Sequence, residues 1–157
     1  MPINLASNGR IGRGKWMGSD PAEINYPGVD TCITVTCRLG RHIVGAHLYY
    51  GNSDQDTRDD LALFAAQALG PLDIYIVGNL NSWKLPRAFR KELLFADGNG
   101  GTLFAAIREA LRYAGVINCY QVTGNLQASL ADGTLTMAQQ TGENRYSVIL
   151  DYMENRM

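Results

Sequence analysis

The sequence predicts a single α+β domain, in which two or three helices pack on a mixed or antiparallel β-sheet core. Apolar residues make up 46% of the 157-residue chain, enough to form a buried core. Segments that alternate apolar and polar residues, as strands do, recur along the chain, and hairpin turns join some of them. Segments with helical spacing lie between these strands, so we expect the helices on the faces of the sheet.

The regular pattern begins only at Pro27, so we expect residues 1–25 to form a flexible or loosely structured arm before a folded domain at 26–157. The arm contains Arg10, Arg13 and Lys15 among glycines and lacks the apolar stretch of a secretory signal peptide. If the protein leaves its cell, a specialised secretion system must carry it.

A β-hairpin is the first predicted element of the domain. Residues 31–38 alternate polar and apolar side chains and are rich in β-branched residues, and residues 42–50 form a second strand. A tight turn at Leu39-Gly40-Arg41 connects them. If Leu39-Gly40 is the turn, paired residue numbers add up to about 79; if Gly40-Arg41 is the turn, they add up to about 81.

The rest of the chain alternates between helices and strands. A helix with a cap at Thr57 ends at Gly70-Pro71, and the loop before Thr102 leads into a helix that ends at Gly115. Asp132-Gly133 is a strong hairpin turn. The remaining predicted elements are a short helix at 86–95 and strands at 72–78, 116–123, 127–130, 134–138 and 146–152.

Composition excludes several classes of function. The 14 basic and 15 acidic residues give a net charge of −1, which does not favour nucleic-acid binding. No apolar run approaches the roughly 18 residues of a membrane span. Cys32, Cys37 and Cys119 match neither a disulfide scaffold nor a zinc pattern, so we expect free thiols, no metal and no cofactor.

Cys32 and His47 are the candidate nucleophile and base, because a cysteine reacts as a thiolate and a nearby histidine can supply that state. Cys32 starts a strand directly after the turn-like residues 25–30, where a thiol can be open to a cleft. With either turn, the residue opposite Cys32 lies near His47 or Tyr49. Opposed Cβ atoms are roughly 4.5–5.5 Å apart and diagonal neighbours roughly 7–8 Å, so we expect a contact within the hairpin.

Two other residues near this pair serve as internal comparisons. Cys37 lies an odd number of residues from Cys32, so we expect it on the opposite face of the strand. His42 is next to the turn and cannot reach Cys32. The spacing alone leaves one alternative open, which is a buried Cys32 beside a histidine of the core.

The residues from Pro27 to Arg38, followed by Val44-Gly45-Ala46-His47, resemble the active-site hairpin of CheD, the family of bacterial chemoreceptor glutamine deamidases. That family has a strand with a cysteine after a small residue, a turn, and a Gly-Ala-rich strand that ends in histidine. Weaker likeness extends the resemblance to about residues 27–140. It includes residues 73–79, 105–115 and 122–125 and the hairpin at Asp132-Gly133.

Three departures separate the chain from CheD itself. The threonine that precedes the family's cysteine by six residues falls at Tyr26, and the Leu-Gly-Ser-Cys turn is Val29-Asp30-Thr31-Cys32. The Gly-Gly-Ala after the middle strand is Gly78-Asn79-Leu80. The same Cys-His arrangement occurs in bacterial deamidase toxins, such as the cytotoxic necrotizing factors and the Burkholderia lethal factor. In the former, the Cys-to-His spacing looks the same as here and a backbone carbonyl can be the third group, so the chain resembles a toxin or effector more closely.

This resemblance implies a protein glutamine deamidase in which Cys32 attacks a side-chain carboxamide and His47 transfers the protons. The backbone N–H groups of Thr31 and Ile33 would stabilise the oxyanion. A third group would orient the imidazole, and the candidates are Asn79, the Asp30 side chain or a backbone carbonyl near residues 26–29.

The resemblance also implies a partner and a location. We expect a monomer that acts on a host signalling protein, such as a small GTPase, after secretion or injection into a target cell; the bacterial cytoplasm is the alternative. The alternatives in function are a related thiol amidase, protease or transglutaminase, and a non-catalytic protein-binding module on the same fold. The preference for glutamine over asparagine stays open.

Overall fold

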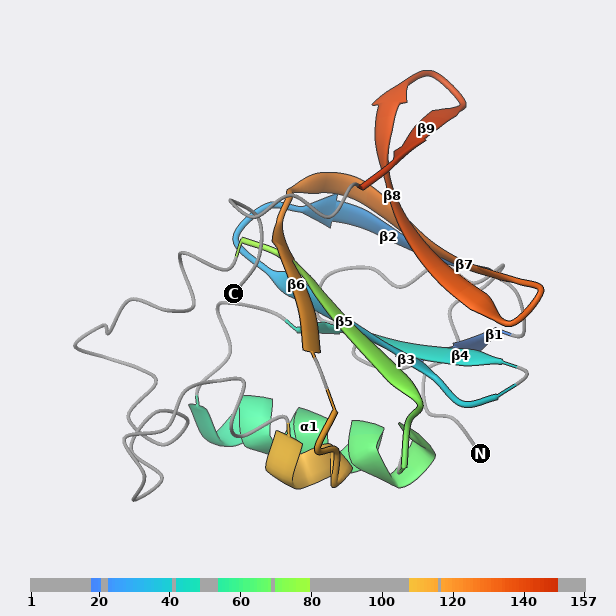
Figure 1. The fold of residues 1–157 in the computed structure, drawn as a ribbon. Helices are drawn as coiled ribbons and strands as arrows, with labels where there is room; N and C mark the ends of the chain where they lie inside the picture. The colour runs from blue at the N-terminus through green and yellow to red at the C-terminus, as the bar shows by residue number, and fades with distance from the viewer. Residues whose placement is uncertain are drawn as a thin grey trace.

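The computed structural model describes residues 18–20, 23–40, 42–48, 54–68, 70–79, 108–115 and 117–149 (Figure 1). Within these ranges the chain forms one long helix and two β-sheets, broadly the α+β class that the sequence predicts, with more strand than helix. The elements are β1 (Gly18–Asp20), β2 (Glu23–Val29), β3 (Ile33–Arg38), β4 (Ile43–Leu48), α1 (Asp54–Ala68), β5 (Asp73–Gly78), β6 (Ile117–Gln121), β7 (Gly124–Ala131), β8 (Thr134–Gly142) and β9 (Arg145–Val148).

The two sheets and the helix form three layers. The five-stranded sheet has the order β1-β4-β3-β5-β6, and all its pairs are antiparallel except the parallel pair β5–β6. The four-stranded sheet has the order β2-β7-β8-β9 and is antiparallel throughout. Figure 1 shows the four-stranded sheet on one side of the five-stranded sheet and α1 on the other.

The alternation of side chains along β3 divides the core into two clusters. Ile33, Val35 and Cys37 belong to the cluster under α1, which includes Phe64. Residues between them point to the opposite face, because successive side chains of a strand alternate. On that face a second cluster joins the two sheets, with Ile24 of β2 among its members. The five-stranded sheet is therefore buried on both faces.

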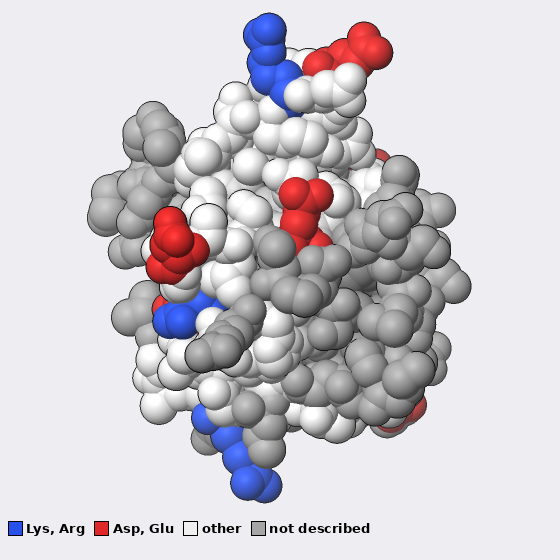
Figure 2. Space-filling model, turned by 90° about the vertical axis from the view of Figure 1, so that its right-hand side faces the viewer, with Lys and Arg blue, Asp and Glu red and all other residues white. Residues whose placement is uncertain are grey.

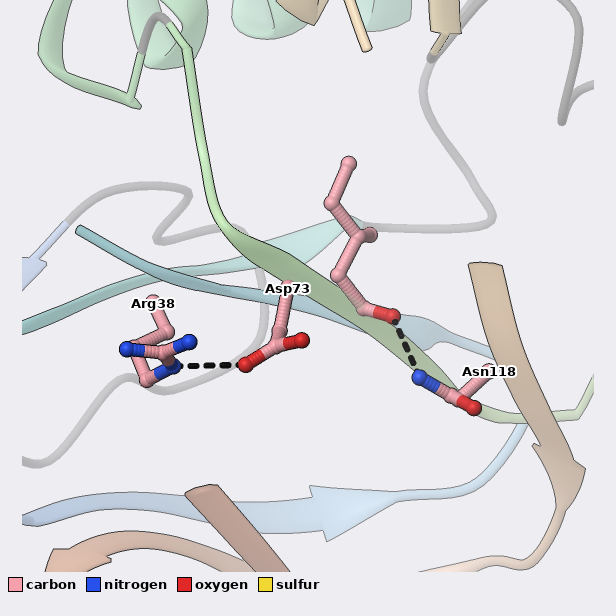
Figure 3. Close-up of polar contacts among 4 residues, drawn as sticks. Arg38, Asp73 and Asn118 are labelled. Atoms are coloured by element: carbon pink, nitrogen blue, oxygen red, sulfur yellow. Dashed lines mark hydrogen bonds and ion pairs between the residues drawn. The ribbon is translucent and has the colours of Figure 1, made fainter. Parts of the chain in front are cut away.

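The ends of β3 and β5 are held by a polar pair (Figure 3). Arg38 Nε donates a hydrogen bond to Asp73 Oδ2 at 2.5 Å, and the two residues are direct partners across the strands. On the other side of β5, Asn118 Nδ2 donates to the carbonyl oxygen of Ile74 at 3.4 Å. This end of the sheet is opposite the end at which β3 begins.

Part of the segment expected to be an N-terminal arm lies in strands. Residues 18–20 form β1, which pairs with β4, and β2 begins at Glu23. The rest of the expected arm lies outside the described residues, as does the predicted helix at 86–95. Of the predicted helix after Thr102, residues 108–111 are described as helical, and Leu111 packs in the cluster under α1.

No helix in the described ranges is long and apolar enough to cross a membrane.

Candidate functional site

The β3–β4 hairpin has the register that a Gly40-Arg41 turn predicts. Ile33 pairs with Leu48 and Thr34 pairs with His47, so paired residue numbers add up to 81. Gly40 has a φ of +85°, a conformation that glycine adopts at little cost. Of the two registers that the sequence left open, this one places His47 opposite Thr34.

Cys32 lies one diagonal step from His47 on the hairpin. Its carbonyl oxygen accepts a hydrogen bond from the backbone N–H of Asn79 at 3.0 Å. The backbone pairing between β3 and β5 therefore extends one residue further, to Cys32 and Asn79. Cys32 is two residues before Thr34, which places Cys32, Thr34 and His47 on one face. Diagonal residues on one face are roughly 7–8 Å apart, and their side chains can approach each other.

Both side chains are buried. Cys32 is 1% exposed and His47 is 0% exposed. The expectation that the Cys32 thiol lies open to a cleft is therefore wrong, because the side chain has almost no exposure to solvent. The sequence left open the alternative that Cys32 is buried beside a histidine of the core. The observed burial of both side chains agrees with that alternative.

Tyr26 of β2 reaches across from the second sheet to the same place. Its ring meets the His47 ring edge-on, with centroids 6.3 Å apart and an interplanar angle of 75°. Its Oη is 2.7 Å from Thr36 Oγ1, a buried hydrogen bond. Gly45 makes room for the phenol, because a Cβ there would overlap Tyr26 Oη and lie 2.9 Å from Cζ. Burial raises the pKa of Tyr26, so the phenol stays neutral.

Sequence reasoning missed this contact. It noted Tyr26 as the position where the CheD threonine is absent and within a segment that could offer a backbone carbonyl, and it gave the Tyr26 side chain no role. The signal was Gly45, since a glycine inside a strand often marks the close approach of another group.

Asn79 lies on the other side of Cys32 from His47. It directly follows β5, and Gly78 pairs with Ile33. A Cβ at Gly78 would lie 2.5 Å from the Cys32 carbonyl oxygen, so only glycine allows β5 to approach β3 this closely. The Asn79 Oδ1 accepts a hydrogen bond from Gln121 Nε2 at 3.3 Å, which holds the amide at this end of the sheet.

The remaining predicted site residues flank Cys32. Asp30 and Thr31 are exposed in the bend between β2 and β3. Ile33 is the first residue of β3, and its buried side chain packs under α1. The structure therefore brings Cys32, His47 and Asn79 together at one end of the sheet, and it leaves the Asp30 carboxylate toward solvent.

The other two cysteines occupy a different environment. Cys37 and Cys119 lie in the cluster under α1, so Cys37 is on the face opposite Cys32, as its odd offset predicts. Burial raises the pKa of the Cys37 thiol, because an apolar surrounding disfavours the thiolate. All three cysteines are free thiols.

Among the described residues on the face that Figure 2 displays, blue and red groups lie scattered among uncharged residues. Within the described ranges, no three potential metal ligands gather at one place.

Comparison with known proteins finds no match: no family model, no curated protein and no solved structure is significantly similar to the chain.

Proposed function

We propose that the chain is a cysteine-dependent protein glutamine deamidase, with Cys32 as the nucleophile and His47 as the base. One observation carries the proposal: Thr34 pairs with His47, and Cys32 is two residues before Thr34, so strand alternation favours Cys32 and His47 on one face, one diagonal step apart. A base within reach of a thiol is what thiol catalysis needs, and one hairpin supplies both residues. The resemblance to CheD and to the deamidase toxins gives the reaction class.

The reaction would run through an acyl-enzyme. His47 takes the proton from the Cys32 thiol, and the thiolate attacks the carbonyl carbon of a glutamine side chain. The N–H groups of Thr31 and Ile33 are the candidates to bind the oxyanion. The tetrahedral intermediate collapses, the C–N bond breaks, and ammonia leaves with a proton from His47. Water, deprotonated by His47, then hydrolyses the thioester to release glutamate and the thiol.

Asn79 is better supported than Asp30 as a group that positions this site. The Asn79 backbone N–H holds the Cys32 carbonyl, and its side chain is anchored by Gln121. Asp30 is exposed in a bend. Tyr26 supports the imidazole ring of His47 by an edge contact. We therefore propose Asn79 and Tyr26 as positioning residues.

The burial of the pair favours a second candidate, a non-catalytic protein-binding module in which Cys32 is structural. With Cys32 1% and His47 0% exposed, a substrate carboxamide needs a local opening to reach the thiol. An apolar surrounding also raises a thiol pKa, which opposes the thiolate. The two candidates therefore differ in one measurable property, the reactivity of Cys32.

Alkylation by dilute iodoacetamide, followed by peptide mass spectrometry, measures that reactivity. Cys37 and Cys119 serve as internal controls, because both are buried thiols remote from His47 on the other face of the sheet. A deamidase predicts that Cys32 reacts at least about tenfold faster than either and that His47→Ala removes the difference. Equal, slow labelling of all three thiols would overturn the enzyme and leave the binding module.

The substrate class follows from a second experiment. Purified chain is incubated with candidate host signalling proteins, small GTPases first, and glutamine-to-glutamate conversion is read by mass spectrometry together with ammonia release. Cys32→Ala should abolish conversion, and the matched variant Cys37→Ala should retain it. Cleaved peptide bonds would favour a thiol protease instead, and crosslinked lysines a transglutaminase. The proposed setting is a bacterial toxin or effector that acts in a target cell, with action in the bacterial cytoplasm as the alternative.

A further inference from the structure

The outer face of the four-stranded sheet carries a hollow of about 470 Å³, separate from Cys32. Carboxamides from three strands line it, and a proline and a tyrosine flank them. These residues are Asn25, Pro27, Asn125, Gln127, Gln140 and Tyr146, and the lining is completed by Tyr26 and Leu126, which belong to the buried core between the sheets. The volume lies within the range of small-molecule sites, roughly 300–1,000 Å³.

Strand alternation explains why amides collect here. In β7, Leu126 and Ala128 pack in the core between the sheets, so Asn125 and Gln127 point outward. Pairing then aligns them with their neighbours: Asn25 is the direct partner of Gln127. The hollow therefore lies on the sheet surface, above the core.

Hydrogen bonds fix how each amide is turned. Gln127 Nε2 donates to Asn25 Oδ1 at 3.0 Å, and Asn125 Nδ2 donates to Gln140 Oε1 at 2.7 Å. Asn125 Oδ1 accepts from the N–H of Gly28 at 2.9 Å. Among the described residues, Gln127 thus uses its Nε2 and Gln140 its Oε1 in these hydrogen bonds. Gln127 Oε1 remains as an acceptor and Gln140 Nε2 as a donor.

Tyr146 adds an aromatic wall next to these two groups. It is the direct partner of Gln140 across β8 and β9, and its side chain is 37% exposed. No Lys, Arg, Asp or Glu is among the residues that line the hollow. Beside the hollow, the Glu23 carboxylate accepts a hydrogen bond from Asn25 Nδ2 at 3.1 Å. The lining therefore offers neutral hydrogen-bond donors and acceptors beside an aromatic face, and it offers no cation to hold a phosphate or a carboxylate.

We propose that this hollow binds a neutral saccharide. Sugar hydroxyls donate and accept hydrogen bonds at once, which matches an acceptor and a donor presented by Gln127 and Gln140. The C–H face of a sugar ring can pack on the exposed ring of Tyr146. The amides are already oriented by their own hydrogen bonds, so binding orders few side chains. The proposal is independent of the chemistry at Cys32.

An extended peptide is the competing occupant, because β9 is an edge strand of the sheet within the described part of the chain. A peptide would use the backbone of β9 at the edge. The hollow is instead lined by residues of all four strands, β2, β7, β8 and β9, and its features are side chains on the face of the sheet. This arrangement favours the saccharide.

Nuclear magnetic resonance can test the proposal on the full chain. The ¹⁵N-labelled protein is titrated with maltose, cellobiose, lactose and diacetylchitobiose at millimolar concentrations. We expect at least one sugar to shift the side-chain amide signals of Gln127 and Gln140 in a saturable way. No saturable shift with any of the four would overturn the proposal. An unlabelled uncharged peptide that instead shifts the backbone amides of β9 would also overturn it.

Three variants sharpen the result. Gln140→Glu keeps the oxygen that accepts from Asn125, but it replaces the Nε2 donor by a second acceptor. This variant should therefore lower the affinity for the sugar about fivefold to tenfold. Tyr146→Ala should weaken it similarly. Ser129→Ala, on the same outer face but outside the hollow, is the matched control and should bind as the natural chain does. Equal affinity of Gln140→Glu and Ser129→Ala would contradict the assignment.

Discussion

The two faces of the five-stranded sheet are built from different kinds of side chains. The face under α1 is apolar, and its cluster contains Val35, Ile76 and Phe64. The face toward the four-stranded sheet buries three polar side chains completely, those of Thr34, Thr36 and His47. The same strands contribute to both faces, so the difference comes from alternate residues rather than from separate regions of the chain.

This difference indicates which face of the sheet can position reacting groups. Apolar packing contributes stability without direction, whereas a buried polar group needs a partner in a defined geometry. Thr34 Oγ1 donates to the Val77 carbonyl at 2.8 Å, and Thr36 pairs with Tyr26. Thr34 and Thr36 are therefore fixed by specific hydrogen bonds on the face that also carries His47, and such fixed surroundings are a requirement for a site that positions reacting groups.

The largest expected effect concerns the apolar face. Phe64 is fully buried under the sheet, so Phe64→Ala should lower the free energy of unfolding by about 3–5 kcal/mol. Urea unfolding followed by circular dichroism measures the change. Leu63→Ala is the matched control, because Leu63 is 41% exposed on the same helix and should change stability by about 0.5 kcal/mol or less. Similar losses for both variants would show that α1 does not pack as described.

The next effect concerns the face with His47. Gly45→Ala places a Cβ against the Tyr26 phenol, so we expect a loss of about 1–3 kcal/mol in the free energy of unfolding. Tyr26→Phe removes the oxygen that the Cβ would overlap. The double variant should therefore lose less than the sum of the two single losses. Simple additivity in urea unfolding would mean that Tyr26 does not occupy the space above Gly45.

Much of the β3–β4 hairpin follows from the sequence. Alternating residues predict both strands, the observed register is one of the two that the sequence predicts, and Cys37 packs under α1, as its odd offset from Cys32 predicts. Asp132-Gly133 also forms the predicted turn, with Ala131 paired to Thr134. Each of these predictions depends on the spacing of residues close together in the chain, which can be read from a single sequence.

The second sheet could not be predicted in this way. Residues 25–30 look like a turn because they contain Pro27 and Gly28, yet Glu23–Val29 is strand β2. Proline is tolerated there because β2 is an edge strand, and the pairing with β7 shifts its register between Tyr26 and Val29. The partner strand lies about a hundred residues later in the chain, and local pattern does not identify such a partner.

In the candidate site, too, the features set by local spacing could be predicted, and those that depend on distant strands could not. The pairing of Thr34 with His47, which sets Cys32 one diagonal step from His47, follows from one of the two hairpin registers that the sequence predicts. Asn79 was one of several candidates, and its place beside Cys32 depends on how β5 pairs with β3. The contact of Tyr26 with His47 depends on the second sheet, so no local signal located it beyond Gly45.

A pH dependence tests the burial of Cys37 on the face under α1. Burial raises the pKa of Cys37, so above its ordinary value of 9.0 the unfolded chain loses the thiol proton before the folded chain does. The folded state then binds more protons, and stability falls as pH rises, by up to about 1.4 kcal/mol per pH unit. Below pH 9 this contribution is fully present. Cys37→Ala should have a shallower decline in urea unfolding between pH 9 and 11, and parallel curves would contradict the burial of this thiol.

The smallest expected effect isolates the hydrogen bond that joins the two sheets at His47. Tyr26→Phe and Thr36→Val each remove one partner of the 2.7 Å bond, and both keep the overall shape of the side chain. A double-mutant cycle in urea should give a coupling energy of about 0.5–1.5 kcal/mol. Phenylalanine keeps the edge contact with the imidazole, so Tyr26→Phe should leave the ratio of Cys32 to Cys37 alkylation rates unchanged. If that ratio falls while stability changes little, the hydroxyl itself positions His47, and the polar face supports the site through this bond as well as through ring packing.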